Sequence, residues 1–556
     1  MIARQTPAPG QSTRIVVDAR CGTIAGSWDA QAKLGRFLGI PYAEPPVGQL
    51  RFRPTVAKTP WAGTLDASRF GPASAQVFDT HEGGIEDFAD GPAGGPDWCV
   101  GSEDSLTLNI WTPAADAAKR PVLVWVHGGA NYLESGRLPI YHGHRLAQRG
   151  DAVFVSFNYR LGIFGFFDIS VLGGDAYRGS HSNGLRDQLT ALRWVKENIA
   201  AFGGDPDNIT LMGESAGSMD ISWLLGSGEI DALVRRVVMM SNVAGPAGFG
   251  DDGKRARHGE AEGQRIARAF LKRLGIDSMS AMMSLTTEEI LGRIAEAADW
   301  SNILFDLDSI FYPCVSADFA PLDPFRAARA GKGANVDMMI GYTNYEMGLW
   351  LQWDDQLDRR PCHWTAARMD YFPDGHREEL IARYADWFAQ DRPGTHGMHL
   401  LGDGMFMMPV TWFAEERLQH NPNVWMYRFD WQVDDRYRAM HAADLCFLFG
   451  HQQTPAATAL IGQARDEADH ASRTRLAASM MDAVLAFARH GDPNAHSNPT
   501  LPLWPRYTTD RRAVMSFDAA CRILNDPASS RRQWWTEKIY QPVMGATSGQ
   551  QKRSDT

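Results

Sequence analysis

The fold is decided by the stretch ITLMGESAG (residues 209–217), which reads as a buried strand, a sharp turn and the start of a helix. The turn has the pattern Gly-x-Ser-x-Gly, whose glycines permit a bend tight enough to expose the Ser215 hydroxyl above a sheet. The backbone N–H of Ala216 then points toward an oxyanion formed at that hydroxyl. Because the chain has 53 glycines, a match to this pentapeptide alone is weak evidence. The weight of this one comes from the strand before it and the helix after it.

A second glycine-rich turn lies upstream of this serine. The apolar run 122–126 leads directly into His127-Gly128-Gly129-Ala130. Lipases and esterases place such a loop after an early strand, where its backbone N–H groups complete an oxyanion hole. The two turns together predict nucleophilic catalysis by Ser215.

A serine hydroxyl is a poor nucleophile until a base takes its proton, and an acid must hold that base. In strand–turn–helix hydrolases the acid and then the histidine follow the serine along the chain. Glu346 follows the apolar run 336–341, and His441 follows the run 424–429. The chain has 16 histidines, so the pattern alone does not separate these two residues from their neighbours.

Short apolar runs bounded by turn residues alternate with helical patterns along the chain. One helix is expected over 185–202, where apolar residues recur every three or four positions before Gly203, and another is expected after the capping box Thr286–Glu289. The alternation predicts an α/β fold with a mostly parallel sheet covered on both faces. Residues 14–40 alternate like antiparallel edge strands. The predicted parallel strands are 121–126, 152–158, 209–212, 237–241, 336–341 and 424–429.

The composition excludes several classes of protein. Of 556 residues, 44% are hydrophobic and 22% are charged, which is typical of a globular chain. The formal net charge of −11 argues against a nucleic-acid partner, because phosphate binding depends on a basic surface. Neither a membrane-spanning run of about 20 apolar residues nor a signal-peptide core is expected. Six scattered cysteines without a CxxC pair are typical of free thiols in a reducing cytoplasm, and a mature secreted form that has lost its leader stays open as the alternative.

Several longer stretches resemble the type-B carboxylesterase family, which includes cholinesterases and bacterial para-nitrobenzyl esterases. No single stretch is specific, but together they run through most of the chain. They are GIPYAEPPVGQLRFRP (39–54), EDSLTLNIWTP (103–113), VWVHGGA (124–130), NYRLGIFGF (158–166), residues 184–217, GYTNYE (341–346), HAADLCFLFG (441–450), GDPN (491–494) and WPRYT (504–508).

The resemblance implies an α/β-hydrolase fold and a serine hydrolase site. It implies Ser215 as nucleophile, Glu346 as acid and His441 as base. The oxyanion hole would use the N–H groups of Gly129, Ala130 and Ala216, with Gly128 shaping the loop. Ser241 and Asp403 match positions near the triad, and Glu214 lies beside the nucleophile; these three are possible supporting residues. Two buried ion pairs are also implied, Arg51–Glu103 and Arg160–Asp187.

This chain departs from the family pattern at four positions. Ser105 stands where animal members have a disulfide cysteine, which agrees with a reducing compartment. Ala130 replaces the third glycine of the loop and adds a methyl group near the substrate. Met347 replaces the glycine usual after the triad acid, which is expected to narrow the site. Trp98 lies closer to the Glu-Asp motif than the choline-binding tryptophan of cholinesterases, which argues against a choline site.

The function expected is hydrolysis of carboxylic esters through an acyl-enzyme, with a small-molecule ester as the substrate and no metal or organic cofactor. Two alternatives stay open. The same machinery can act on amides, carbamates or a dedicated bulky ester, since pocket loops set specificity. A non-catalytic interaction protein on this scaffold is disfavoured, because all three triad candidates are present. The sequence gives no indication of the oligomeric state.

One large domain is expected over 13–542, because no Pro- or Ser-rich linker divides the chain. Helix-rich insertions near 250–335 and 350–420 are expected to cap the sheet as walls of a gorge. Residues 1–12 and 543–556 are expected to be polar tails. The Gly- and acid-rich stretch 80–97 is predicted to be a long surface loop.

Overall fold

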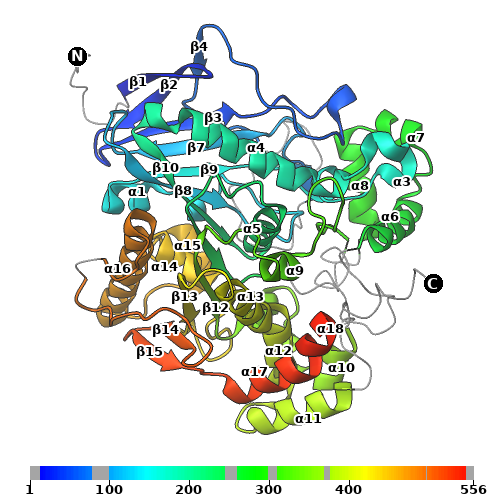
Figure 1. Ribbon diagram of the computed structural model, residues 1–556, viewed down its shortest axis with the longest axis vertical. Helices are drawn as coiled ribbons and strands as arrows, with labels where there is room; N and C mark the ends of the chain where they lie inside the picture. Colours follow the sequence, from blue (N-terminus) through cyan, green and yellow to red (C-terminus); the bar gives the residue numbers. More distant parts are fainter. Residues whose placement is uncertain are drawn as a thin grey trace.

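The computed structural model describes residues 13–77, 99–243, 259–298, 310–368, 376–495 and 498–545. Within these ranges, a 13-stranded sheet has the order β1-β2-β3-β7-β9-β8-β10-β11-β12-β13-β14-β15, with β4 beside β2 (Figure 1). All neighbours from β9 to β14 are parallel. The pairs beyond them along this order are antiparallel at both ends. The α/β class and the antiparallel edge near the N-terminus are therefore confirmed.

The predicted strands are present, most of them with ends shifted by no more than two residues, but the strand predicted at 209–212 is longer and runs over Gly204–Glu214. The sheet strands are β1 Thr13–Ala19, β2 Gly22–Asp29, β3 Leu34–Pro41, β4 Thr64–Asp66, β7 Thr107–Thr112, β8 Arg120–Val126, β9 Val153–Phe157, β10 Gly204–Glu214, β11 Arg236–Met240, β12 Asp337–Thr343, β13 Val424–Phe429, β14 Ala513–Phe517 and β15 Arg522–Asn525. A separate two-stranded sheet pairs β5 Gln76–Val77 with β6 Cys99–Val100.

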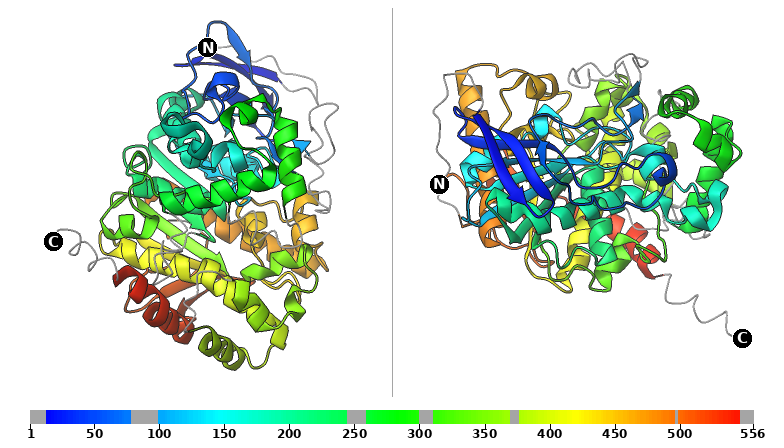
Figure 2. Two further views of the ribbon diagram at one scale, coloured as in Figure 1. Left: turned by 90° about the vertical axis from the view of Figure 1, so that its right-hand side faces the viewer. Right: turned by 90° about the horizontal axis from the view of Figure 1, so that it is seen from above.

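Strand β8 shows why the central strands are apolar throughout. Val122, Val124 and Val126 belong to the core on one face of the sheet, which also contains residues of α4 Asn183–Asn198 and α5 Ala216–Ser227. Leu123 and Trp125 belong to the core on the other face, with residues of α1 His144–Gly150 and α16 Glu467–His490. Helices on both faces thus bury alternate side chains of the same strand. Figure 2 shows these layers from two further sides.

The two helix predictions are confirmed, and the sequence signals on which they rested, a terminating glycine and a capping box, have the expected geometry. The predicted 185–202 helix is α4 followed by a 3-10 turn, Ile199–Phe202, which ends at Gly203 with a φ of 83°. The capping box stands at the start of α8 Thr287–Ala297, where the Thr286 hydroxyl accepts a bond from the Glu289 N–H at 3.1 Å. Capping of this kind satisfies backbone donors that lack a partner in the first turn.

Both expected insertions are rich in helix within the described residues. The first contains α6 Glu260–Leu274, α7 Met279–Ser284, α8 and α9 Pro324–Arg329. The second contains α10 Cys362–Arg368, α11 Arg377–Trp387, α12 Pro393–Gly402 and α13 Met408–Leu418. The remaining helices are α2 Gly162–Gly165, α3 Ser170–Gly173, α14 Ala443–Leu448, α15 Pro455–Ile461, α17 Ser529–Trp535 and α18 Gln541–Gly545.

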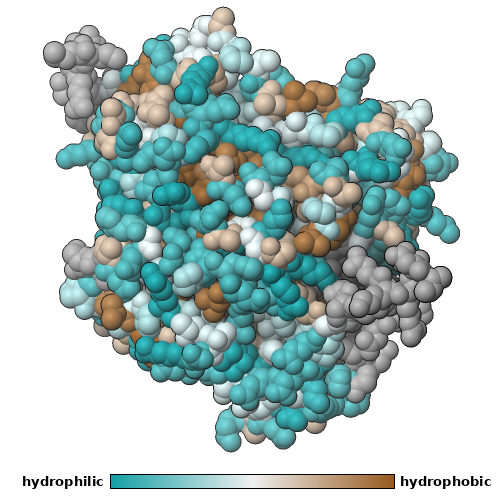
Figure 3. All heavy atoms as spheres, in the orientation of Figure 1, coloured by the Kyte–Doolittle hydropathy of each residue, from teal (hydrophilic) through white to brown (hydrophobic). Residues whose placement is uncertain are grey.

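The predicted surface features are only partly covered by the described residues. The stretch 80–97 and residues 1–12 lie outside them. At the other end α18 reaches Gly545, three residues into the expected tail, and Met544 is buried because it packs against the core. On the face drawn in Figure 3, hydrophobic residues form small separate patches among hydrophilic ones. Within the described ranges, no helix combines the length and apolar character needed to cross a membrane.

Both ion pairs implied by the family resemblance are present and buried. Arg160 donates from Nε and Nη2 to the two carboxylate oxygens of Asp187, each at 2.8 Å. Arg51 donates from Nε to Glu103 Oε2 at 2.8 Å. Ser105, at the position of the absent cysteine, is fully buried and its hydroxyl lies 2.9 Å from that of Ser74.

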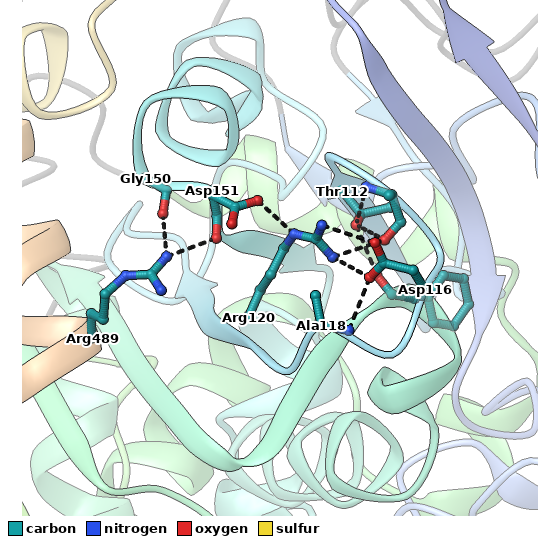
Figure 4. A network of polar contacts seen from close by, with 9 residues as sticks. Thr112, Asp116, Ala118, Arg120, Gly150, Asp151 and Arg489 are labelled. Carbon is teal, nitrogen blue, oxygen red and sulfur yellow. Dashed lines mark hydrogen bonds and ion pairs between the residues drawn. The ribbon is translucent and has the colours of Figure 1, made fainter.

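Arg120 is the first residue of β8, and its side chain makes hydrogen bonds to residues of neighbouring loops (Figure 4). This end of β8 is opposite to the loop that begins at His127. Arg120 donates to Asp151 Oδ1 at 2.6 Å and to Asp116 Oδ2 at 3.0 Å. The hydrogen bond from Arg120 lowers the pKa of Asp116.

Arg120→Ala is expected to lower the free energy of unfolding by about 1–3 kcal/mol, because charge-assisted hydrogen bonds are lost at a buried arginine. The two aspartates stay exposed to water, so no buried charge is stranded. Denaturant unfolding checks the loss of stability. A change in kcat of more than about twofold would contradict the separation of this network from the site.

Candidate active site

Ser215 occupies the sharp turn between β10 and α5. Its backbone has φ 54° and ψ −123°, a strained conformation for a residue other than glycine. The flanking glycines allow it, since a Cβ on Gly217 would lie 2.3 Å from the carbonyl oxygen of Val126 and one on Gly213 would lie 2.7 Å from the carbonyl carbon of Gly217. Ser215 is partly accessible, whereas its neighbours Glu214 and Ala216 are buried. The turn therefore presents this hydroxyl as the sequence predicts.

The loop after β8 lies against the same turn. A Cβ on Gly128 would lie 3.3 Å from Ser215 Cβ and 2.9 Å from Glu214 Oε2. Gly129 and Ala130 have φ values of 84° and 50°, and both are partly accessible. Within the described residues, no recorded hydrogen bond uses their N–H groups. Ala216 begins α5, and the first N–H groups of a helix have no partner within it. The three predicted donors thus flank Ser215 from two elements.

Glu346 follows β12 and is held from three sides. Its Oε1 accepts from the Ser241 hydroxyl at 2.8 Å and from the Thr343 N–H at 2.7 Å, and its Oε2 lies 2.6 Å from His441 Nδ1. The backbone N–H of His441 also donates to the Glu346 carbonyl oxygen at 3.1 Å. The structure therefore brings together the predicted acid, the predicted base and Ser241.

The other ring nitrogen of His441 faces the residue before the serine. Nε2 lies 3.0 Å from Glu214 Oε1. Within the described part of the chain, no hydrogen bond joins His441 to the Ser215 hydroxyl itself. Burial alone would lower the pKa of His441, but the carboxylates of Glu214 and Glu346 raise it well above its usual value. Glu214 thus adds negative charge beside the predicted base.

This charge predicts an alkaline pH profile. Only the neutral imidazole accepts a proton, so kcat/KM is expected to fall as the pH drops through a His441 pKa above the ordinary value of about 6.5. Glu214→Gln removes one of the two raising charges, so the acid limb should move to lower pH. Glu415→Gln, which alters a carboxyl group paired with Arg512, is the matched control and should leave it in place. Profiles that coincide for wild type and Glu214→Gln would contradict this account.

Asp403, the third predicted supporting residue, lies apart from the other two. It accepts hydrogen bonds from Arg531 at 2.6 Å and from the Tyr384 hydroxyl at 2.5 Å. Asp403 and Glu346 line the same small pocket. Asp403 is therefore near the acid without a recorded bond to it. Met347 is fully buried and packs near Gly402, so its side chain belongs to the core, and the expected narrowing of the site stays a prediction.

Sequence reasoning missed three residues around His441. The Trp350 and Phe406 rings lie 5.2 and 4.7 Å from the imidazole between centroids. Trp350 comes four residues after Glu346, and this closeness to the predicted acid was the sequence signal that could have identified it as a neighbour of the site. Asp444 is fully buried and accepts from the Tyr427 hydroxyl at 3.0 Å. Burial, then the charges of Glu214 and Glu346, raise the pKa of Asp444 to about 7. Trp98 lies outside the described residues.

Known proteins match the chain over nearly its whole length. The model of the Carboxylesterase family matches residues 13–535. The para-nitrobenzyl esterase of Bacillus subtilis (strain 168) is 32% identical over 530 residues, which cover 94% of this chain and 98% of that protein. The phenmedipham hydrolase of Pseudarthrobacter oxydans is 31% identical over 525 residues, covering 93% and 98%.

A solved structure agrees with the sequence matches. A carboxylesterase of Geobacillus stearothermophilus superposes with a TM-score of 0.78 at 31% identity and covers 94% of this chain and 99% of that one. The chain therefore belongs to the carboxylesterase family and is a serine carboxylic ester hydrolase with the α/β-hydrolase fold.

Proposed function

We propose that Ser215, His441 and Glu346 are the nucleophile, base and acid of this hydrolase. The observation that carries the proposal is the chain of contacts from Ser241 through Glu346 to His441, whose Nε2 lies next to the residue preceding Ser215. All these groups follow the carboxyl ends of neighbouring parallel strands, where α/β enzymes assemble their sites.

The reaction uses these groups twice. Ser215 Oγ attacks the ester carbonyl carbon while its proton passes to His441 Nε2, and Glu346 holds Nδ1–H and stabilises the imidazolium. The N–H groups of Gly129, Ala130 and Ala216 bind the oxyanion. His441 then returns the proton to the departing alcohol, which leaves an acyl-enzyme. Water attacks this ester with the same base, the acid is released and Ser215 is regenerated.

The substrate class proposed is an apolar ester with an aryl or medium-sized alcohol group. The partly accessible ring of Trp350 and the buried ring of Phe406 lie beside His441, where the leaving group departs. The name of one relative, a para-nitrobenzyl esterase, is consistent with an aryl-containing substrate. A carbamate is the second candidate, because the same acyl-transfer steps apply to it.

A fluorophosphonate probe tests the assignment. The probe should add once, and peptide mass spectrometry should locate it on Ser215. Hydrolysis of para-nitrophenyl butyrate should stop in proportion to labelling. Turnover that continues on fully labelled protein would overturn the assignment. Comparing para-nitrophenyl esters with aryl carbamates then ranks the two substrate classes.

We also infer that the protein works in a reducing compartment, namely the cytoplasm. Five of the six cysteines are free thiols in the described residues: Cys21, Cys314, Cys362, Cys446 and Cys521. The expected result is six titratable thiols after denaturation of protein that was purified without reductant from its own cells. Fewer than six would contradict the inference.

The proposed domain organisation is one catalytic unit over 13–542. This proposal is supported by the single sheet that runs from β1 to β15 and by the hydrophobic core that residues of both helical insertions share with it.

A further inference from the structure

The loop that carries two of the proposed oxyanion donors has a costly backbone conformation. Gly129, Ala130 and Asn131 are three successive residues with φ values of 84°, 50° and 63°. Only the first is a glycine, and the other two lie in the left-handed region, a strained conformation that persists only where the surroundings hold it. Two turn bonds to the Gly129 carbonyl, from Tyr132 and Leu133, close the loop but do not fix it to the rest of the site.

Asn131 supplies that attachment. Its side chain is fully buried, and Nδ2 donates to Asp220 Oδ1 at 3.3 Å. Its backbone carbonyl accepts from the Gly162 N–H at 2.7 Å. The residue directly after Ala130 is thus anchored at both its main chain and its side chain.

Asp220 lies on α5, the helix that begins at the third proposed donor, Ala216. It is also fully buried, and its second oxygen accepts from Gln188 Nε2 on α4 at 2.5 Å. The Asn131–Asp220 contact therefore connects the loop of Gly129 and Ala130 to the helix of Ala216. An oxyanion hole assembled from two elements works only if both keep their relative position within a fraction of an ångström.

We propose that Asn131 and Asp220 are positioning residues that keep the loop half and the helix half of the oxyanion hole in register. The inference rests on the proposed function, because it takes Gly129, Ala130 and Ala216 as the oxyanion donors. Neither side chain touches the substrate in this role.

The chemistry of Asp220 indicates which substitution preserves the link. Burial raises the pKa of Asp220 to about 8, and the hydrogen bonds from Gln188 and Asn131 lower it only in part. Burial thus favours the neutral form of this carboxyl group. Within the described residues, Asn131 Oδ1 and Gln188 Oε1 have no hydrogen-bond partner. Each of these amide oxygens can therefore accept a hydrogen bond from an uncharged donor on residue 220. Asn fits this position in size and in hydrogen bonding.

The test compares turnover with the affinity for a trifluoromethyl ketone. Ser215 Oγ adds to the ketone carbon, the serine proton passes to His441, and the ketone oxygen becomes an oxyanion held by the same donors. Asn131→Ala and Asp220→Ala are each expected to lower kcat by roughly 10- to 100-fold, with KM within about twofold of wild type. The affinity for the ketone should fall by the same factor as kcat. These losses are smaller than the roughly 100- to 1,000-fold loss of kcat that follows removal of one whole oxyanion donor. Asp220→Asn should stay within about threefold of wild type at pH 7.

Asn198→Ala is the matched control. Asn198 is a buried asparagine at the far end of α4, and its side chain bonds the Cys21 N–H and the Trp194 carbonyl. It should lower the melting temperature without changing kcat or the ketone affinity. If Asn131→Ala lowered only the melting temperature, as is expected of Asn198→Ala, the role of Asn131 would be purely structural and the proposal would be overturned. An Asp220→Asn variant as impaired as Asp220→Ala would overturn it too. Failure of the proposed function is distinct, because the fluorophosphonate would then miss Ser215 in the wild type.

Discussion

Ser215→Ala is expected to reduce kcat/KM for para-nitrophenyl butyrate by roughly 10⁵- to 10⁶-fold, the range found when the nucleophile of a triad is removed. Without Oγ no acyl-enzyme forms, and the oxyanion donors can assist only direct attack by water. The variant should fold normally, because alanine meets the same steric limits as serine at a φ of 54°. Steady-state kinetics with a thermal unfolding curve separate the two effects.

The matched control for this variant is Ser218→Ala. Ser218 is buried on α5 one turn beyond the nucleophile, and its hydroxyl has no partner within the described residues. Its removal should leave kcat, KM and fluorophosphonate labelling within about twofold of wild type. If Ser215→Ala kept more than about a tenth of the wild-type rate, another residue would have to be the nucleophile.

The parts of the fold with strong local signals could be predicted from the sequence. Central strands such as β8 are apolar throughout because both faces are covered, and the Gly203 stop and the Thr286 capping box act through neighbouring backbone groups. The Gly-x-Ser-x-Gly turn belongs to this class, since backbone geometry alone requires its glycines.

Contacts between distant segments were not readable in the same way. The local sequence did not distinguish Glu346 and His441 from neighbouring candidates, and only the family resemblance did so. Nothing local marks two side chains that are 95 positions apart in the sequence and 2.6 Å apart in the structure. The same holds for Asn131 and Asp220, 89 positions apart. The burial of Met347 was not readable either: its neighbour in the chain is catalytic in the proposed mechanism, yet its own side chain packs into the core.

Glu346→Gln is expected to lower kcat by about 10⁴-fold through the tautomer of His441. In the structure one carboxylate oxygen accepts from Ser241 and from the Thr343 N–H, and the other faces His441 Nδ1. A glutamine keeps its oxygen on the two donors and turns its NH₂ toward Nδ1. Nδ1 must then accept, the ring proton moves to Nε2, and the nitrogen that has to take the serine proton is blocked.

Ser241→Ala distinguishes this mechanism from a general loss of order, because the Thr343 N–H still holds the same oxygen and the charge remains. We expect a fall in kcat of no more than about tenfold for it. Glu346→Gln should also move the acid limb of the pH profile downward, since one of the two carboxylates that raise the pKa of His441 is gone. A Glu346→Gln variant within tenfold of wild type would mean that Glu214, 3.0 Å from Nε2, orients the ring in place of Glu346. In that case Nε2 would be occupied by the orienting acid, and the path of the proton from Ser215 would have to be assigned anew.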